Sequence, residues 1–166
     1  MYTAVLIREI LEDYRMPVRG FHGVVHWARV LENGLRLAEA TGANVEVVTL
    51  FALFHGSRRV SDGHDPKHGL RGADFARSLR GSLIHLDDRD FELLYEACRL
   101  HTDGLTEGDV TLQTCWDADR LDLGRVGITP LPHLLCSDAA RGLLEWADQR
   151  AVEEYEPEIV RNDWGL

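Results

Sequence analysis

The chain has 166 residues and a formal net charge of −10, with 45% hydrophobic and 28% charged residues. This length is enough to bury a sizeable core, and we expect one domain over residues 1–166. No apolar run approaches the roughly 18 residues that a membrane span needs. The acidic balance argues against non-specific binding to nucleic acids, because an acidic surface repels the phosphate backbone.

The N-terminal segment MYTAVLIREILEDYRM carries acids and arginines within its apolar pattern, which is not typical of a signal peptide. We therefore expect a cytoplasmic protein. Cys98, Cys115 and Cys136 are odd in number and form no CxxC pair. This pattern favours reduced, mostly buried thiols over a metal or catalytic role.

Apolar residues recur at helical rather than alternating spacing along nearly the whole chain, which predicts an all-α fold. A first helix is expected within residues 5–14. A long second helix is expected over residues 21–40, and Gly42 is well placed to end it.

The segment VEVVTLFALF, residues 45–54, is the most apolar part of the chain. It is rich in β-branched residues and could form a buried strand. We expect a helix from Val45 to His55, capped by Asn44, because no partner strand is evident elsewhere. The Asp-Gly and Asp-Pro pairs in SRRVSDGHDPK, residues 57–67, predict a loop after it.

The second half of the chain also has helical periodicity. Expected helices are residues 68–79, residues 87–101 with an aspartate cap, residues 109 to about 123, and residues 137–155 with Ser137 as the cap. The C-terminal segment EPEIVRNDWGL is expected to be irregular. The prediction is an all-helical single domain with short connections.

Several histidines are placed at the ends of these predicted helices. His22 and His26 lie one turn apart on the second helix, and His55 ends the apolar helix. His68 opens the next helix, and His101 closes a later one. Ligands from different helices of a bundle are a common way to build a metal centre. The remaining histidines, His64, His85 and His133, have no such companions and are interpreted as loop or structural residues.

Asp117 lies four residues before Leu121, so it is expected on an apolar helix face. A carboxylate on such a face is costly unless it is paired or bound to a metal. Asp117 could pair with Arg120 at i,i+3 instead. Neutral imidazole and carboxylate together suit divalent transition metals, so a metal site and a purely structural role both remain open at this point.

Five segments in order resemble the HD-domain metal-dependent phosphohydrolases: HWARVLENGLRLAE, LFALFH, HGLRGADFA, ACRLHTDG and DADRLDLGRVGI. The resemblance covers a core of about residues 20–128, to which the C-terminal helix of about residues 137–155 is added. It implies an HD-type helical bundle. It also implies that His26, His55 and Asp117 bind one divalent metal, and that His68 and His101 hold a second metal or contact substrate phosphate.

The chain departs from the family pattern at Gly56, where the family has the aspartate of a His-Asp doublet. Three interpretations are open: an engineered or chance substitution that disables the site, a natural member with a simplified site, or a protein that has lost catalysis and kept the fold. Because a ligand is missing, we expect weaker metal binding and a large loss of rate.

The resemblance implies a metal-dependent phosphohydrolase that uses one or two ions of Mn, Fe, Co, Ni or Zn and acts on a small phosphoester, such as a nucleotide. Arg58 and Arg59 are candidates to clamp a phosphate, since the planar guanidinium suits that task, or to pair with Asp62 or Asp65. His22 and Lys67 are candidates for substrate binding. Asp119 and Asp122 are interpreted as supporting or structural residues.

Two other functions stay open. Two histidines and one carboxylate also describe non-haem iron oxygenases, and Gly56 favours a catalytically inactive nucleotide-binding module. Trp146, Trp164 and the apolar face of the last long helix would suit a homodimer as well as a core.

Overall fold

The computed structural model describes residues 2–166, and within that range it contains helices and no strand. The α-helices are α1 (Tyr2–Glu12), α2 (Val24–Thr41), α3 (Val45–Phe54), α4 (His68–Ser78), α5 (Asp88–Leu100), α6 (Val110–Arg120), α7 (Asp138–Val152) and α8 (Ile159–Asn162). Two short 3-10 helices, η1 (Leu123–Val126) and η2 (Pro132–Leu134), connect α6 to α7. The predicted all-α single domain is confirmed.

The apolar segment is a helix, α3, and it lies at the centre of the domain. Every residue from Val47 to Phe54 except Thr49 is buried. Oδ1 of Asn44 accepts from the backbone N–H groups of Glu46 and Val47, at 3.0 and 3.1 Å. The β-branched residues lower helix propensity only slightly, and burial of the helix on all sides outweighs that cost.

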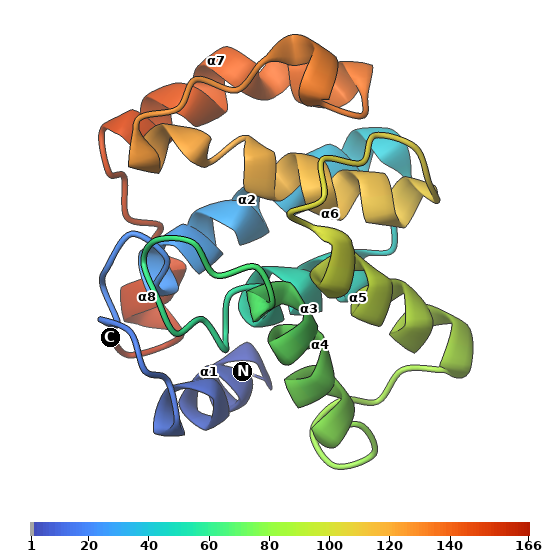
Figure 1. The fold of residues 1–166 in the computed structure, drawn as a ribbon, viewed down its shortest axis with the longest axis vertical. Helices are drawn as coiled ribbons and strands as arrows, with labels where there is room; N and C mark the ends of the chain where they lie inside the picture. Colours follow the sequence, from blue (N-terminus) through green and yellow to red (C-terminus); the bar gives the residue numbers. More distant parts are fainter. Residues whose placement is uncertain (1) are drawn as a thin grey trace.

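The other helices surround α3. α2 packs against both α3 and α6, while α5 packs against α3 and α4. Figure 1 shows α7 lying across one end of the molecule, beyond α2 and α6, and α1 at the opposite end. The histidines at the ends of α3, α4 and α5 therefore start from neighbouring helices.

Several helix boundaries follow the predicted signals. Gly42 ends α2 in the left-handed conformation, with φ of 75°, and its N–H bonds the carbonyl of Ala38. Asp87, Asp109 and Ser137 cap α5, α6 and α7 with side-chain oxygens. In contrast, α2 begins at Val24 rather than at residue 21, because residues 21–23 form a turn.

The C-terminal segment differs from the prediction of an irregular tail. It contains α8, which packs against α2 and buries Val160. Trp164 is 5% exposed, and its Nε1 donates to the hydroxyl of Thr3 at 3.3 Å. Trp164 therefore belongs to the core, whereas Trp146 remains partly exposed on α7. Among the described residues, no helix has both the length and the apolar character required to cross a membrane.

Candidate metal centre

Two imidazole rings from different helices meet in the interior. His26 lies in the first turn of α2, and His55 directly follows α3. Both side chains are buried, and their Nε2 atoms are 3.0 Å apart. The packing of α2 on α3 brings these rings together.

The opposite edge of each ring faces hydrogen-bond acceptors. Nδ1 of His26 lies 2.6 Å from Oδ2 of Asp122, and Nδ1 of His55 lies 3.0 Å from the carbonyl oxygens of Phe51 and Ala52. These acceptors assign the proton of each neutral ring to Nδ1. The two Nε2 lone pairs then face each other, which is unfavourable unless a cation lies beside them.

Asp119 completes a set of three possible ligands. Its Oδ1 lies 3.4 Å from Nε2 of His26 and 3.4 Å from Nε2 of His55. The three donor atoms all lie within 4.8 Å of one another. Burial and the nearby charge of Arg125 lower the pKa of His26, against the opposing effects of Asp119 and Asp122. Two imidazoles and a carboxylate fit a divalent transition metal.

The prediction that Asp117 is the third ligand is wrong. Asp117 is fully buried, as expected, but its carboxylate accepts from the backbone N–H groups of Cys136 and Ser137 at 2.6 and 3.1 Å. It also accepts from the hydroxyl of Ser137 at 2.9 Å. Burial raises the pKa of Asp117, and these bonds oppose that effect. Asp117 therefore fixes the start of α7.

Asp119 was interpreted as a supporting residue, and the structure instead brings it to the histidines. Two residues along a helix correspond to a rotation of about 200°, so Asp117 and Asp119 point to different sides of α6. Asp122 lies beyond the end of α6, so helical spacing from Asp122 gives no signal that favours Asp119. Nothing in the composition of the segment distinguishes the acids.

Asp122 orients His26 from behind. It is buried, and its Oδ1 accepts from Nε of Arg29 at 2.7 Å. Burial alone would raise the pKa of Asp122, but His26 and Arg29 hold it below its ordinary value. A carboxylate behind a ligating histidine fixes the ring and increases its basicity. The interpretation of Asp122 as a supporting residue agrees with this geometry.

A second pair of imidazoles lies beside the first. Nε2 of His68 and Nε2 of His101 are 3.0 Å apart. Their Nδ1 atoms face the carbonyl oxygens of Asp65 and Cys98, at 2.6 and 2.7 Å. The rings of His55 and His101 have centroids 5.2 Å apart, so the two pairs form one cluster. Burial lowers the pKa of His101 to about 3.

The four histidines and Asp119 line a cavity of about 200 Å³. His22, Gly56 and Arg59 also line this cavity, together with Arg125, which sequence reasoning missed. The guanidinium of Arg125 is held by the carbonyls of Phe21 and Asp122, at 2.8 and 2.9 Å. Its position three residues after Asp122 is a weak signal, since any i,i+3 pair on a surface has the same spacing.

The remaining predicted residues divide into two groups. His22 lines the cavity and contacts the carbonyl oxygen of Asp62 through Nε2, at 3.2 Å. Arg58 does not line it: its Nη1 donates to the carbonyl of Ile10 at 3.0 Å, in a neighbouring cavity. Lys67 is exposed at the start of α4 and does not line it either. The structure therefore does not bring Arg58 and Lys67 to the histidines.

Gly56 leaves a confined space at the cavity wall. A Cβ atom at this position would lie 3.2 Å from Nε1 of Trp27 and 3.7 Å from the carbonyl oxygen of His22. Nε1 of Trp27 is buried and has no hydrogen-bond partner among residues 2–166. The 3.2 Å contact is tight, so a side chain at position 56 requires a small shift of Trp27, and an acceptor oxygen on that side chain could then pair with Nε1 of Trp27.

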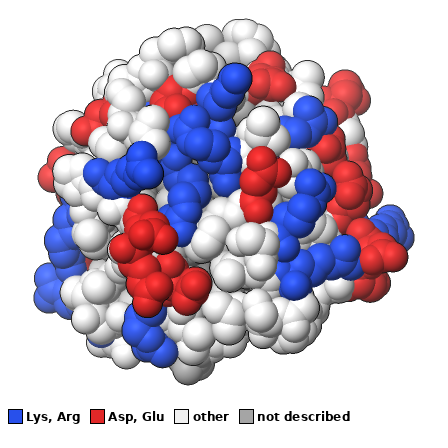
Figure 2. All heavy atoms as spheres, turned by 60° about the horizontal axis from the view of Figure 1, so that its bottom comes forward, with Lys and Arg blue, Asp and Glu red and all other residues white. Residues whose placement is uncertain are grey.

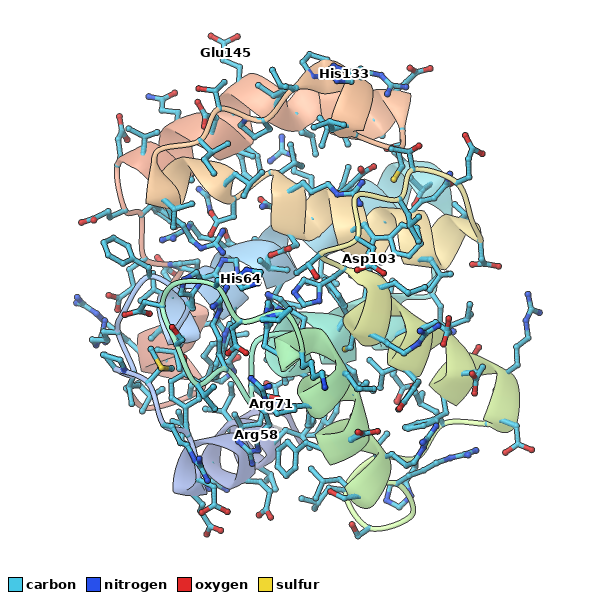
Figure 3. The ribbon with its side chains drawn as sticks, viewed as in Figure 1. Arg58, His64, Arg71, Asp103, His133 and Glu145 are labelled. Atoms are coloured by element: carbon cyan, nitrogen blue, oxygen red, sulfur yellow. The ribbon has the colours of Figure 1, made fainter. Side chains whose placement is uncertain are left out.

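The three exposed histidines lie outside the cluster. His64 is in the loop before α4, and His133 is on the side of the molecule occupied by α7 (Figure 3). Nε2 of His85 lies 3.1 Å from the carbonyl oxygen of Ser82. These positions agree with their interpretation as loop or structural residues.

Comparison with known proteins gives no relative for the chain: no family model, no curated protein and no solved structure matches it. The similarity to the HD-domain phosphohydrolases therefore rests on the five sequence segments.

Proposed function

We propose that the chain is a metal-dependent phosphohydrolase of the HD type that acts on a small phosphoester. The observation that supports this most strongly is the 3.0 Å distance between Nε2 of His26 and Nε2 of His55. The carboxylate of Asp119 lies 3.4 Å from each of these atoms. His26, His55 and Asp119 would hold a divalent transition metal. When bound, the metal would supply charge stabilisation and a water of lowered pKa.

Two arginines can position the phosphate. Arg59 and Arg125 both line the cavity with the histidines. Nη1 of Arg59 donates to the carbonyl oxygens of Ser61 and Gly63, which fixes the side chain in its loop. Arg125 is held by two further carbonyls. Cations fixed in advance can offset charge that develops on phosphoryl oxygens without a cost of reorganisation.

Position 56 provides the test of this proposal. We expect Gly56→Asp to bind Mn²⁺ more tightly and to release phosphate from nucleotides faster than the original chain, because a fourth ligand is restored. Gly56→Asn has nearly the same volume without the charge and serves as the control. The measurement is phosphate release from a panel of nucleotides with Mn²⁺, Co²⁺, Ni²⁺ or Mg²⁺. Metal binding without phosphate release by either the original chain or Gly56→Asp would contradict the proposal and favour an inactive nucleotide-binding module.

A non-haem iron oxygenase is the second candidate, because His26, His55 and Asp119 are the donor set that such enzymes use. The two arginines at the cavity favour the hydrolase. The distinguishing measurement is oxygen consumption by the iron-loaded protein, which the phosphohydrolase proposal expects to be absent.

A further inference from the structure

A second cavity, of about 550 Å³, lies next to the metal centre between the segment that follows α1, the loop after α3, and α4. Four arginines line it: Arg15, Arg58, Arg59 and Arg71. Figure 3 shows Arg58 and Arg71 close together between α1 and α4. With the α1 end of the molecule turned forward, Figure 2 shows basic side chains gathered on this face beside acidic clusters.

Arg58 lines this cavity, and one side of its guanidinium is held in place. Its Nη1 donates to the carbonyl oxygens of Ile10 and Ser57, at 3.0 and 2.9 Å, and its guanidinium lies 3.5 Å from the ring centroid of Phe75. Its Nε and Nη2 have no hydrogen-bond or ion-pair partner among residues 2–166. These two donors form the edge with which arginine binds a phosphate bidentately.

Nearby acids neutralise part of the positive charge of this cavity. Nη2 of Arg71 pairs with Asp65 at 2.6 Å, while Arg15 is exposed and has no ion-pair partner among the described residues. Asp13 and Asp74 line the cavity, and Oδ1 of Asp74 accepts from the hydroxyl of Tyr95 at 2.7 Å. Four arginines and two aspartates line the cavity, Asp65 pairs with Arg71, and Asp13 and Glu9 lie near Arg58. The lining itself is richer in arginine than in aspartate, which favours an anion there in a chain of net charge −10.

Arg59 lines both cavities, so the two lie side by side. We propose that the arginine-lined cavity binds a second phosphate group of the ligand whose first phosphate lies at the metal centre. The ligand is then a compound with two separated phosphate groups. This identification of the substrate class rests on the proposed function, whereas the anion site itself does not.

The anion site is tested with inorganic pyrophosphate and metal-free protein, by titration calorimetry. We expect Arg15→Gln and Arg58→Lys each to raise the dissociation constant about fivefold to tenfold, since each removes charge-assisted hydrogen bonds. Arg8→Gln removes the same charge from exposed α1 and is expected to change nothing. Thermal unfolding of Arg58→Lys checks that the fold is kept. Pyrophosphate that does not bind, or that binds all variants equally, would overturn the site.

Whether one ligand occupies both cavities is tested with two substrates that differ in the number of phosphate groups. For a nucleoside 3′,5′-bisphosphate, Arg15→Gln should raise KM several-fold, while KM for the corresponding 5′-monophosphate and kcat for both stay unchanged. No effect of Arg15→Gln on KM for either substrate would show a separate anion site rather than one extended ligand, and an equal increase for both would show that Arg15 acts on the phosphate they share; either result overturns the proposal. If neither substrate is hydrolysed, the proposed function fails, and the pyrophosphate titration still decides the anion site.

Discussion

Asp119 and Asp117 are two residues apart on α6 and have different partners. Asp119 lies 3.4 Å from the Nε2 atoms of His26 and His55, whereas Asp117 accepts from the Cys136–Ser137 segment. Removing the charge of Asp119 should therefore affect metal binding, and removing the charge of Asp117 should affect the free energy of unfolding.

We predict that Asp119→Asn lowers affinity for Mn²⁺ at least tenfold and changes the stability of the metal-free protein little. Asp117→Asn should keep metal affinity and lower the free energy of unfolding by about 1–3 kcal/mol, because it disturbs buried hydrogen bonds. Metal titration and urea unfolding of both variants provide the measurements. Weaker metal binding by Asp117→Asn, together with unchanged metal binding by Asp119→Asn, would show that Asp117 is the ligand.

The sequence predicted the histidines better than it predicted their partners. His26, His55, His68 and His101 were placed at helix ends, and hydrophobic periodicity brings such ends together in a bundle. The choice between Asp117 and Asp119 depends on the rotation of α6 about its axis, and the apolar residues of α6 are spread around the helix, so they do not fix that rotation. Both acids are in fact turned away from bulk water, which sequence spacing alone does not reveal.

At the scale of helices, the close approach of α4 to α5 keeps His68 beside His101. Gly69 follows His68, and a Cβ atom there would lie 2.4 Å from the carbonyl oxygen of Cys98 and 3.0 Å from Nδ1 of His101. Only glycine permits this distance without a shift of the backbone.

We expect Gly69→Ala to lower the free energy of unfolding by about 1–3 kcal/mol, because the two helices must move apart. Gly142→Ala on α7 is the matched control: a Cβ atom there meets nothing within 4 Å. That change should stabilise the protein by about 0.5–1 kcal/mol through helix propensity. Equal effects of the two substitutions in urea unfolding would contradict the account of helix packing.

Most elements were predictable because caps and periodicity agreed. Asn44, Asp87, Asp109 and Ser137 each begin a helix as their side-chain chemistry predicts. α8 was missed because a helix of 4 residues has no periodic pattern of its own, and its stability comes from packing against the core.

At the scale of the whole molecule, buried neutral histidines couple stability to pH. Burial and nearby arginines lower the pKa of His22 to about 4, and burial lowers that of His101 to about 3. In the unfolded chain both titrate near pH 6.5. Between these values the unfolded state binds more protons, so the free energy of unfolding falls as the pH decreases below about 6.5.

We therefore predict that the urea midpoint of the chelator-treated protein is constant above about pH 7 and decreases between pH 6.5 and 5, a range in which carboxylates titrate little. His22→Gln should make this decrease shallower, and His64→Gln, in the exposed loop, should leave it unchanged. A midpoint that is constant from pH 7.5 to 5 would show that these rings are not held neutral in the folded protein.

The most direct test of the metal centre is anomalous diffraction from crystals of the protein grown with Mn²⁺. We expect the strongest peak to lie at bonding distance from Nε2 of His26, Nε2 of His55 and the carboxylate of Asp119, either alone or with a second peak beside it. A peak at Asp117, a peak on the surface only, or crystals of Mn²⁺-saturated protein with no peak among these side chains would contradict this expectation.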